Sequence, residues 1–133
     1  MSASITVAGN LTRDLEHRVT DGGRSVASAR LAVNRRVPDD RGGWRDTDPT
    51  FLNVTVWGPL ADHAAESLHK GDRVVVAGDL REEQWTDQHG LQRSTMVVHA
   101  TEIAMSLKWG AVTGFEKRTN DRGDGLDERE GPS

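Results

Sequence analysis

The segment from Phe51 to Gly58 alternates between aliphatic residues and residues that are polar or aromatic. Successive side chains of a β-strand point to opposite faces, so this pattern predicts a strand with two different faces. One face is an aliphatic strip suited to a core, formed by Leu52, Val54 and Val56. The other face is polar with a large ring at each end, and consists of Phe51, Asn53, Thr55 and Trp57. At about 3.3 Å per residue, the two rings lie roughly 20 Å apart.

The two rings have two interpretations. In the first, which is favoured for a strand considered alone, the two rings pack beneath neighbouring loops. Aromatics interleaved with small polar residues on an exposed sheet face also form a stacking platform for unpaired bases. Three of the four tryptophans, Trp44, Trp57 and Trp85, are predicted to lie on polar faces or in loops, and tyrosine is absent. Core packing alone does not explain this distribution.

The alternation extends to four further segments. The first is a long, bent strand in which Gly9 is predicted to be a bulge or a point of close backbone approach. A turn at Asp21-Gly22-Gly23 precedes the second strand. In chain order, the five predicted strands cover residues 5–19, 25–34, 51–58, 73–83 and 93–103.

A single short helix is predicted between the third and fourth strands. Leu60, Ala64 and Leu68 recur every four residues, Pro59 suits the first helical turn, and Gly71 is the predicted stop. Five strands with one helix in this position is the order of the OB-fold, a small Greek-key barrel. The predicted fold class is therefore all-β, a five-stranded OB-fold barrel with one short helix between strands 3 and 4.

The segment from residue 35 to residue 49 is predicted to be a charged loop. Its four aspartates fit no calcium-loop spacing, and the surrounding arginines oppose a cation. Turns closed by aspartate side chains are expected instead. Trp44, which lies between Gly-Gly and Arg-Asp, has little core available to bury it.

The composition excludes several classes of function. The 133 residues suit one domain, and the absence of cysteine excludes disulfides, cysteine–zinc sites and thiol nucleophiles. The histidines are scattered, and no glycine-rich phosphate loop or serine elbow is present. We therefore expect no enzyme, cofactor or metal site. The start of the chain does not resemble a signal peptide and no segment suits a membrane span, so a cytoplasmic protein is expected.

The net charge of −4 hides an uneven distribution. Residues 1–45 contain eight arginines against five acidic residues, a net charge of +3. The planar guanidinium of arginine stacks on bases and binds phosphate with two parallel hydrogen bonds. The first third of the chain is therefore the expected source of phosphate contacts.

Five sequence blocks resemble bacterial single-stranded-DNA-binding proteins in collinear order. The blocks are residues 7–14, 31–35, 56–61, 70–74 and 85–90, within a likeness that spans roughly residues 4–110. Residues 102–109 further resemble the actinobacterial branch of that family. Any one block would be weak, whereas five in order are highly specific.

The resemblance implies a nucleoid-associated OB-fold homotetramer that binds single-stranded DNA without sequence preference in replication, recombination and repair, and that has no catalytic activity. The family's base-stacking aromatics match Phe51, Trp57 and Trp85, and also Trp44 in the actinobacterial form of the loop. The arginines expected to hold phosphates are Arg13, Arg30, Arg35, Arg36 and Arg45.

The predicted domain covers residues 1–115, with an extra strand near residues 109–115 that clamps subunits together in the actinobacterial branch. Residues 116–133 contain almost nothing apolar and are predicted to be a disordered tail. Family members usually end in an acidic tip closing with Pro-Phe that docks replication and repair enzymes. This chain ends Gly131-Pro132-Ser133, so the resemblance implies a short-tailed paralogue and does not extend to this docking.

Two other functions remain open at this point. The same fold serves RNA-binding and tRNA-binding modules, which matched DNA and RNA oligomers would distinguish. An OB-fold protein-interaction module could instead use the exposed aromatics as interface hot spots. In that case, oligo-dT would not quench the tryptophan fluorescence.

Overall fold

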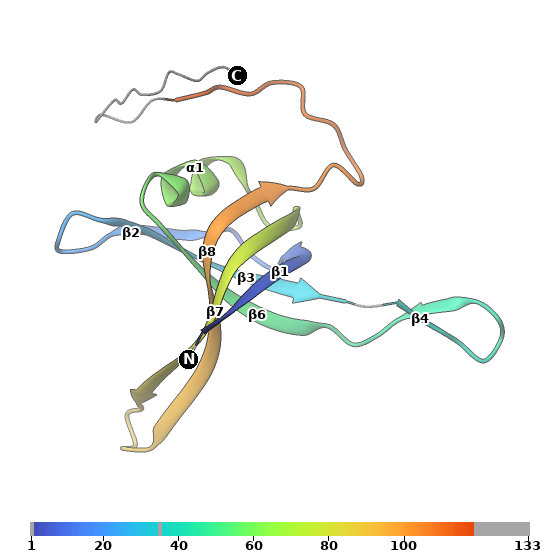
Figure 1. Cartoon of the computed structure of the whole chain (residues 1–133), viewed down its shortest axis with the longest axis horizontal. Coiled ribbons are helices and arrows are strands. Elements are labelled where there is room, and N and C mark those ends of the chain that lie inside the picture. The colour runs from blue at the N-terminus through green and yellow to red at the C-terminus, as the bar shows by residue number, and fades with distance from the viewer. Residues whose placement is uncertain (1, 35, 119–133) are drawn as a thin grey trace.

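The structure is a computed structural model, and it describes residues 2–34 and 36–118 (Figure 1). Strands dominate it, with one short helix. In chain order its elements are β1 (Ser2–Leu11), β2 (Glu16–Val19), β3 (Ser25–Val33), β4 (Arg36–Pro38), β5 (Trp44–Asp46), β6 (Thr50–Trp57), α1 (Pro59–Ser67), β7 (Arg73–Thr86) and β8 (Gln92–Met105).

Five strands form a closed ring in the order β1-β7-β8-β6-β3, and the pairing of β1 with β3 completes it. Strands β6 and β8 pair in parallel, whereas the other neighbours in the ring are antiparallel. The helix follows the third ring strand and precedes the fourth. This arrangement confirms the predicted OB-fold, and β2 is an addition that extends the sheet beyond β3.

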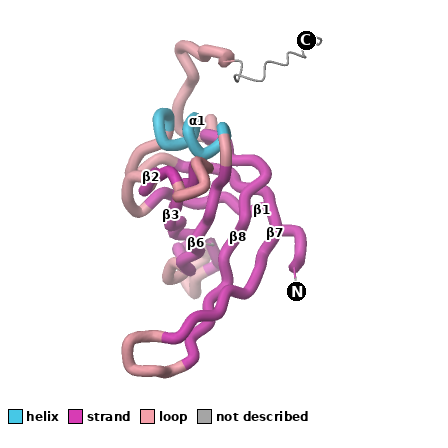
Figure 2. Tube along the Cα trace, turned by 90° about the vertical axis from the view of Figure 1, so that its left-hand side faces the viewer, coloured by secondary structure: helices cyan, strands magenta, loops and turns pink. Residues whose placement is uncertain are grey.

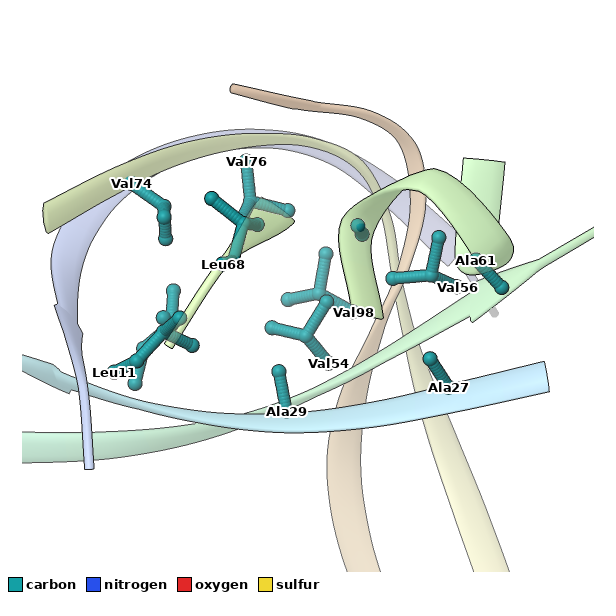
Figure 3. Close-up of a cluster of buried hydrophobic side chains, with 12 residues drawn as sticks. Leu11, Ala27, Ala29, Val54, Val56, Ala61, Leu68, Val74, Val76 and Val98 are labelled. Carbon is teal, nitrogen blue, oxygen red and sulfur yellow. The ribbon is translucent and has the colours of Figure 1, made fainter. Parts of the chain in front are cut away.

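The core is built from small and β-branched side chains that meet inside the ring and beneath α1 (Figure 3). The aliphatic strip predicted for β6 is buried at Val54 and Val56, and β3 buries Ala27, Ala29 and Leu31 beside it, all at most 2% exposed. Ala61, Ala64 and Leu68 of the helical region join the same cluster. The helix therefore closes one end of the ring, and the opposite faces of β3 and β6 point outward.

The predicted first strand over residues 5–19 is wrong, because the chain breaks there into two strands. Strand β1 ends at Leu11, and the next amide, that of Thr12, donates to the carbonyl of Arg30 at 3.0 Å. The chain then bends, and β2 pairs with the first half of β3. Gly9 is the predicted point of close approach, since a Cβ there would lie 2.8 Å from the Ala32 carbonyl oxygen.

The predicted helix stop at Gly71 is also wrong. The helix ends at Ser67, and Leu68 adopts an extended conformation while its amide donates to the Ala64 carbonyl. This conformation accompanies the burial of the Leu68 side chain, which is 5% exposed. Gly71 lies in the following turn with a φ of +92°, where its amide donates to the Leu11 carbonyl.

The loop predicted over residues 35–49 contains the two-stranded hairpin β4–β5. Its turn is closed by Asp39, whose carboxylate accepts hydrogen bonds from the amides of Arg41 and Gly43, both at 2.9 Å. This confirms the predicted aspartate turn. The β4–β5 hairpin and the β7–β8 hairpin both project away from the ring (Figures 1 and 2), and we call them the β4–β5 arm and the β7–β8 arm.

Three sequence predictions are not tested by the described residues of a single chain: the role of Arg35, the tail and the clamp strand. Arg35 and residues 119–133 lie outside the described residues, and with them most of the predicted tail. Residues 106–118 contain no strand in the described chain. Because the expected clamp near residues 109–115 forms between subunits, it stays a prediction.

Candidate nucleic-acid interface

The outer face of β3 and β6 carries both rings of the central strand. The antiparallel register places Val26 opposite Trp57, Ser28 opposite Thr55, Arg30 opposite Asn53 and Ala32 opposite Phe51. Residues directly opposite one another share a face of the sheet, so all eight side chains point outward from the ring. Phe51 is 46% exposed and Trp57 is half-buried. The two rings therefore occupy opposite ends of one polar surface, which we call the outer face.

Each of these rings has an arginine over it. The guanidinium carbon of Arg30 lies 4.5 Å from the Phe51 ring centroid, and that of Arg24 lies 4.4 Å from the Trp57 ring centroid. At this separation the cation is attracted to the ring face. Arg30 is one of the predicted phosphate residues, whereas Arg24 was missed. Arg24 lies in the turn before β3, and only the pairing of β3 with β6, which places Val26 opposite Trp57, brings it to this ring.

The β4–β5 arm carries another predicted group of residues. Trp44 is 60% exposed and lies opposite Pro38. Arg36 and Arg45 are exposed, but only Arg36 has a carboxylate nearby, at 3.8 Å from Asp46. The arm therefore presents one ring and two guanidinium groups, those of Arg41 and Arg45, without an ion-pair partner among the described residues.

The β7–β8 arm presents Trp85, which is 47% exposed and lies opposite Arg93. Its turn is held by Asp87, whose carboxylate lies 2.8 Å from the Arg93 guanidinium and also accepts the amides of His89 and Leu91. The hydrogen bond from Arg93, followed by that from the Leu91 amide, lowers the pKa of Asp87 below its ordinary value. The turn that presents Trp85 is therefore fixed by an ionised carboxylate.

A histidine–glutamate pair joins the outer face to the root of the β7–β8 arm. His99 of β8 lies opposite Thr55 of β6, and its Nε2 atom is 2.8 Å from the carboxylate of Glu83 on β7. The histidines are scattered along the sequence, and their spacing does not indicate this pair. The two residues are 16 positions apart, so only the pairing of β7 with β8 brings them together.

The structure therefore distributes the predicted site residues that it describes over four places. Phe51, Trp57 and Arg30 share the outer face, while Trp44, Arg36 and Arg45 belong to the β4–β5 arm and Trp85 to the β7–β8 arm. Arg13 lies apart in the bend between β1 and β2, where its Nε atom is 4.0 Å from Glu16. Arg35 lies outside the described residues.

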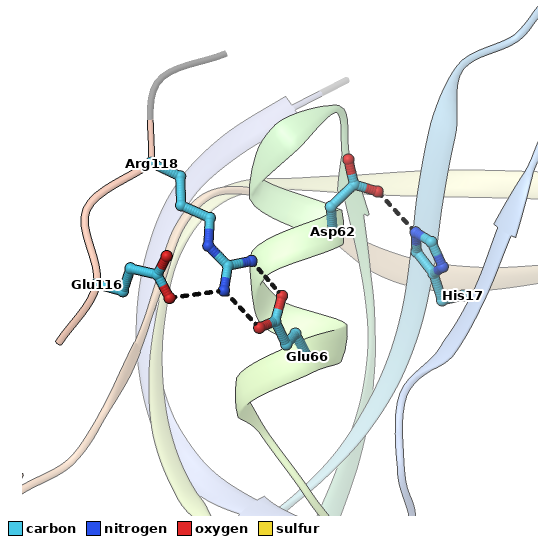
Figure 4. Close-up of polar contacts among 5 residues, drawn as sticks. All are labelled: His17, Asp62, Glu66, Glu116 and Arg118. Atoms are coloured by element: carbon cyan, nitrogen blue, oxygen red, sulfur yellow. Dashed lines mark hydrogen bonds and ion pairs between the residues drawn. The ribbon is translucent and has the colours of Figure 1, made fainter. Parts of the chain in front are cut away.

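The helix α1 is tied to its surroundings by exposed polar contacts (Figure 4). His17 of β2 lies 2.8 Å from Asp62, and Arg118 contacts Glu66 through two nitrogens at 2.5 and 2.8 Å. Hydrogen bonds from Ser25 and then His17 lower the pKa of Asp62, and the Arg118 guanidinium lowers that of Glu66. The Arg118 contact fastens the end of the described chain across the helix. Residues of α1, β8 and the segment that follows β8 line a groove of about 1030 Å³.

Two further properties of the described residues bear on function. No group of three or more histidine, aspartate or glutamate side chains among them could hold a metal ion. Within the same residues, no helix has the length and apolar character needed to cross a membrane.

Comparison with known proteins finds a matching family and related sequences. The model of the single-strand binding protein family matches residues 2–106. The single-stranded DNA-binding protein of Mycobacterium bovis is 35% identical over 131 residues, covering 98% of this chain and 79% of its own length. Single-stranded DNA-binding protein 2 of Streptomyces coelicolor is 36% identical over 122 residues, covering 91% of this chain and 60% of its own.

A solved structure agrees with these relatives. The crystal structure of a small single-stranded DNA-binding protein from Streptomyces coelicolor superimposes with a TM-score of 0.69 at 29% identity, covering 80% of this chain and 96% of that one. The relatives are actinobacterial, as the sequence blocks predict. With a family match over most of its length and relatives above 30% identity, this chain belongs to the single-strand binding protein family.

Proposed function

We propose that this chain is a non-catalytic protein that binds and protects single-stranded DNA without sequence preference, in replication, recombination and repair. Family membership and the names of the curated relatives support single-stranded DNA as the ligand. The observation that carries the proposal is the pair of rings at opposite ends of β6, each with an arginine over it. Each ring can stack on a base, and the arginine beside that ring can bind the adjacent phosphate.

The proposed roles follow from this chemistry. Bases stack on the rings of Trp44, Phe51, Trp57 and Trp85, and every base has a π-face, so stacking is tolerant of sequence. The proposed phosphate contacts come from Arg13, Arg30, Arg35, Arg36 and Arg45. Residues 46–133 carry nine basic against sixteen acidic residues, so the attraction to DNA depends on the arginines of the first 45 residues.

We further propose that the protein is a homotetramer that acts in the cytoplasm, associated with the nucleoid. Two features support assembly. Most of β1 has β7 on one edge and no other strand of the described chain on its second edge, since its pairing with β3 involves only Asn10 and Leu11. Large apolar side chains are also exposed beyond β8, including Trp109 at 70% and Phe115 at 88%. If residues 109–115 form the clamp strand, the neighbouring subunit against which they pack covers these rings, and native mass spectrometry tests the assembly.

The deciding experiment is titration of the intact protein with oligo-dT while its tryptophan fluorescence is followed. Stacking on Trp44, Trp57 and Trp85 predicts strong quenching that saturates, and a mixed-sequence DNA of equal length should behave alike. Quenching by an RNA oligomer with clearly higher affinity would favour the RNA-binding alternative. The absence of quenching and binding with either nucleic acid would overturn the proposal and favour a protein-interaction module.

A further inference from the structure

The hairpin formed by β2 and β3 brings two arginines to the Trp57 end of the outer face. Arg18 lies opposite Val26 in the β2–β3 register, and Val26 lies opposite Trp57 in the β3–β6 register. The three side chains therefore form one row across the outer face. Arg24, at the end of the hairpin turn, completes the group with its guanidinium 4.4 Å from the Trp57 ring centroid.

Burial along this row shows that its side chains lie close to the sheet. Val26 is 3% exposed although it points outward from the ring, so neighbouring side chains cover it. Its direct neighbours on that face are Trp57 and Arg18. Trp57 is itself half-buried, unlike the exposed Trp44 and Trp85. The Trp57 ring is therefore held in a defined place, with Arg24 over it.

The backbone of Arg24 is also fixed. Its carbonyl accepts the Thr20 amide at 2.8 Å, and its amide donates to the Thr20 hydroxyl at 3.2 Å. The following residue, Ser25, accepts the Gly58 amide at 2.9 Å, which ties the hairpin to the end of β6. Arg24 is consequently delivered to Trp57 by a hairpin that is joined to the strand carrying the ring.

Neither arginine of the hairpin is neutralised. Among the described residues, Arg18 and Arg24 form no ion pair, whereas Arg13, Arg36 and Arg93 each have a carboxylate within 4.0 Å. Both side chains are exposed. In an acidic chain, two uncompensated guanidinium groups beside one aromatic ring favour a polyanion as the ligand at this place.

We propose that Arg18, Arg24 and Trp57 form a composite nucleotide subsite that carries the single strand past the end of β6 and onto the β2–β3 hairpin. A base takes the ring face that Arg24 covers in the free protein, and Arg24 moves to an adjacent phosphate. Arg18 holds the next phosphate toward β2. This subsite rests on the proposed function and adds two phosphate contacts that the family resemblance did not indicate.

The test uses the intact protein, oligo-dT and a series of salt concentrations. Each phosphate contact contributes about 0.7 to the log–log slope of affinity against salt on a single strand. Arg24→Gln and Arg18→Gln should each lower the magnitude of that slope by about this amount, and the double variant should lower it by about twice as much. Lys117→Gln, in the segment that follows β8, removes the same charge from a residue with no place in the proposed site and should leave the slope near that of wild type.

A second variant separates the charge from the stacking. Arg24→Lys keeps the positive charge but lacks the planar group, so it should retain the wild-type salt slope while changing the tryptophan fluorescence of the free protein. Thermal melting of each variant checks that the barrel is intact. If the Arg18 and Arg24 variants keep the wild-type slope while the wild type binds oligo-dT, the subsite is wrong and the proposed function stands. Failure of the wild type to bind would instead overturn the proposed function.

Discussion

The guanidinium of Arg30 lies over the ring of Phe51, at 4.5 Å from its centroid, although the two residues belong to different strands. Arg30 is opposite Asn53, and Phe51 is opposite Ala32, so the contact is a diagonal one across the β3–β6 pair. Two residues predicted to act separately, one on a base and one on a phosphate, therefore form a single unit. Removing either one alters the environment of the other.

This unit gives a first prediction about coupling. Arg30→Ala and Phe51→Ala should each weaken oligo-dT binding, but their combined effect should differ from the sum of the two by about 0.5–1 kcal/mol, the range for an exposed cation–π contact. The measurement is a double-mutant cycle of affinities at one salt concentration. Strict additivity would mean that the contact seen in the free protein has no role in the complex.

A second prediction concerns Trp57. A base stacked on an aromatic ring contributes about 1–3 kcal/mol by alanine substitution, so Trp57→Ala should weaken oligo-dT binding roughly ten- to a hundred-fold. The loss should occur at every salt concentration, because stacking releases no counterions. Since Trp57 is half-buried, melting must be measured alongside affinity. A sharply lower melting temperature with unchanged affinity of the folded fraction would assign the ring to packing.

Strand periodicity predicted much of the fold because the buried faces of β3 and β6 alternate without interruption. It failed at Leu11, where the apolar spacing continues through Leu15 and Val19 although the backbone turns away. The Thr12 amide pairs with the Arg30 carbonyl there, a contact between residues 18 positions apart. Local pattern carries no information about such a pairing.

In the candidate site, too, some features follow from the pattern within one strand and others depend on the pairing between strands. The outward direction of Phe51 and Trp57 followed from parity within one strand. The arginines over these rings come from β3 and from the turn before it, so their contacts depend on strand register. The His99–Glu83 pair likewise requires β7 and β8 to be paired. Within-strand geometry could be predicted from the sequence, whereas between-strand geometry could not.

A third prediction concerns the turn of the β7–β8 arm. The pKa of Asp87 is lowered below its ordinary value of 3.8, so its ionised form stabilises the folded arm fully above that pH. The contribution is lost as the pH falls through the lower, folded-state pKa. Asp87→Asn should therefore loosen the arm at neutral pH, increase amide exchange near Trp85 and weaken oligo-dT binding by less than about five-fold, as expected for an exposed ion pair.

Acid titration of the wild type and of the Asp87→Asn variant shows whether Asp87 is the group that holds the turn. In the wild type, the amide signals of His89 and Leu91 should shift as Asp87 becomes protonated, below pH 3.8. In Asp87→Asn these shifts should disappear, while overall melting at neutral pH changes little. Unchanged exchange and affinity in the variant would show that Asp87 does not hold the arm.

A fourth prediction tests the register of the β7–β8 hairpin at Gly78. This residue lies at the register shift between β7 and β8, and a Cβ there would collide with the carbonyl oxygen of His99. Because the obstacle is backbone, Gly78→Ala should destabilise the fold by about 1–3 kcal/mol, as overpacking does. Gly110→Ala is the matched control, since no atom lies within 4 Å of its added Cβ. Equal denaturation midpoints for the two variants would contradict the register described for this hairpin.

The last prediction compares two arginines of the β4–β5 arm. Arg36 lies 3.8 Å from the carboxylate of Asp46, whereas Arg45 has no ion-pair partner among the described residues. A phosphate that binds Arg36 must compete with Asp46, so the net gain there is smaller. Arg45→Gln should therefore lower the salt slope of oligo-dT binding by about 0.7, the value for one phosphate contact, and Arg36→Gln by less. Asp46→Asn should strengthen binding, because it releases Arg36. If Asp46→Asn leaves the affinity unchanged and both arginine variants keep the wild-type slope, the arm does not hold phosphate, and its contribution is limited to stacking on Trp44.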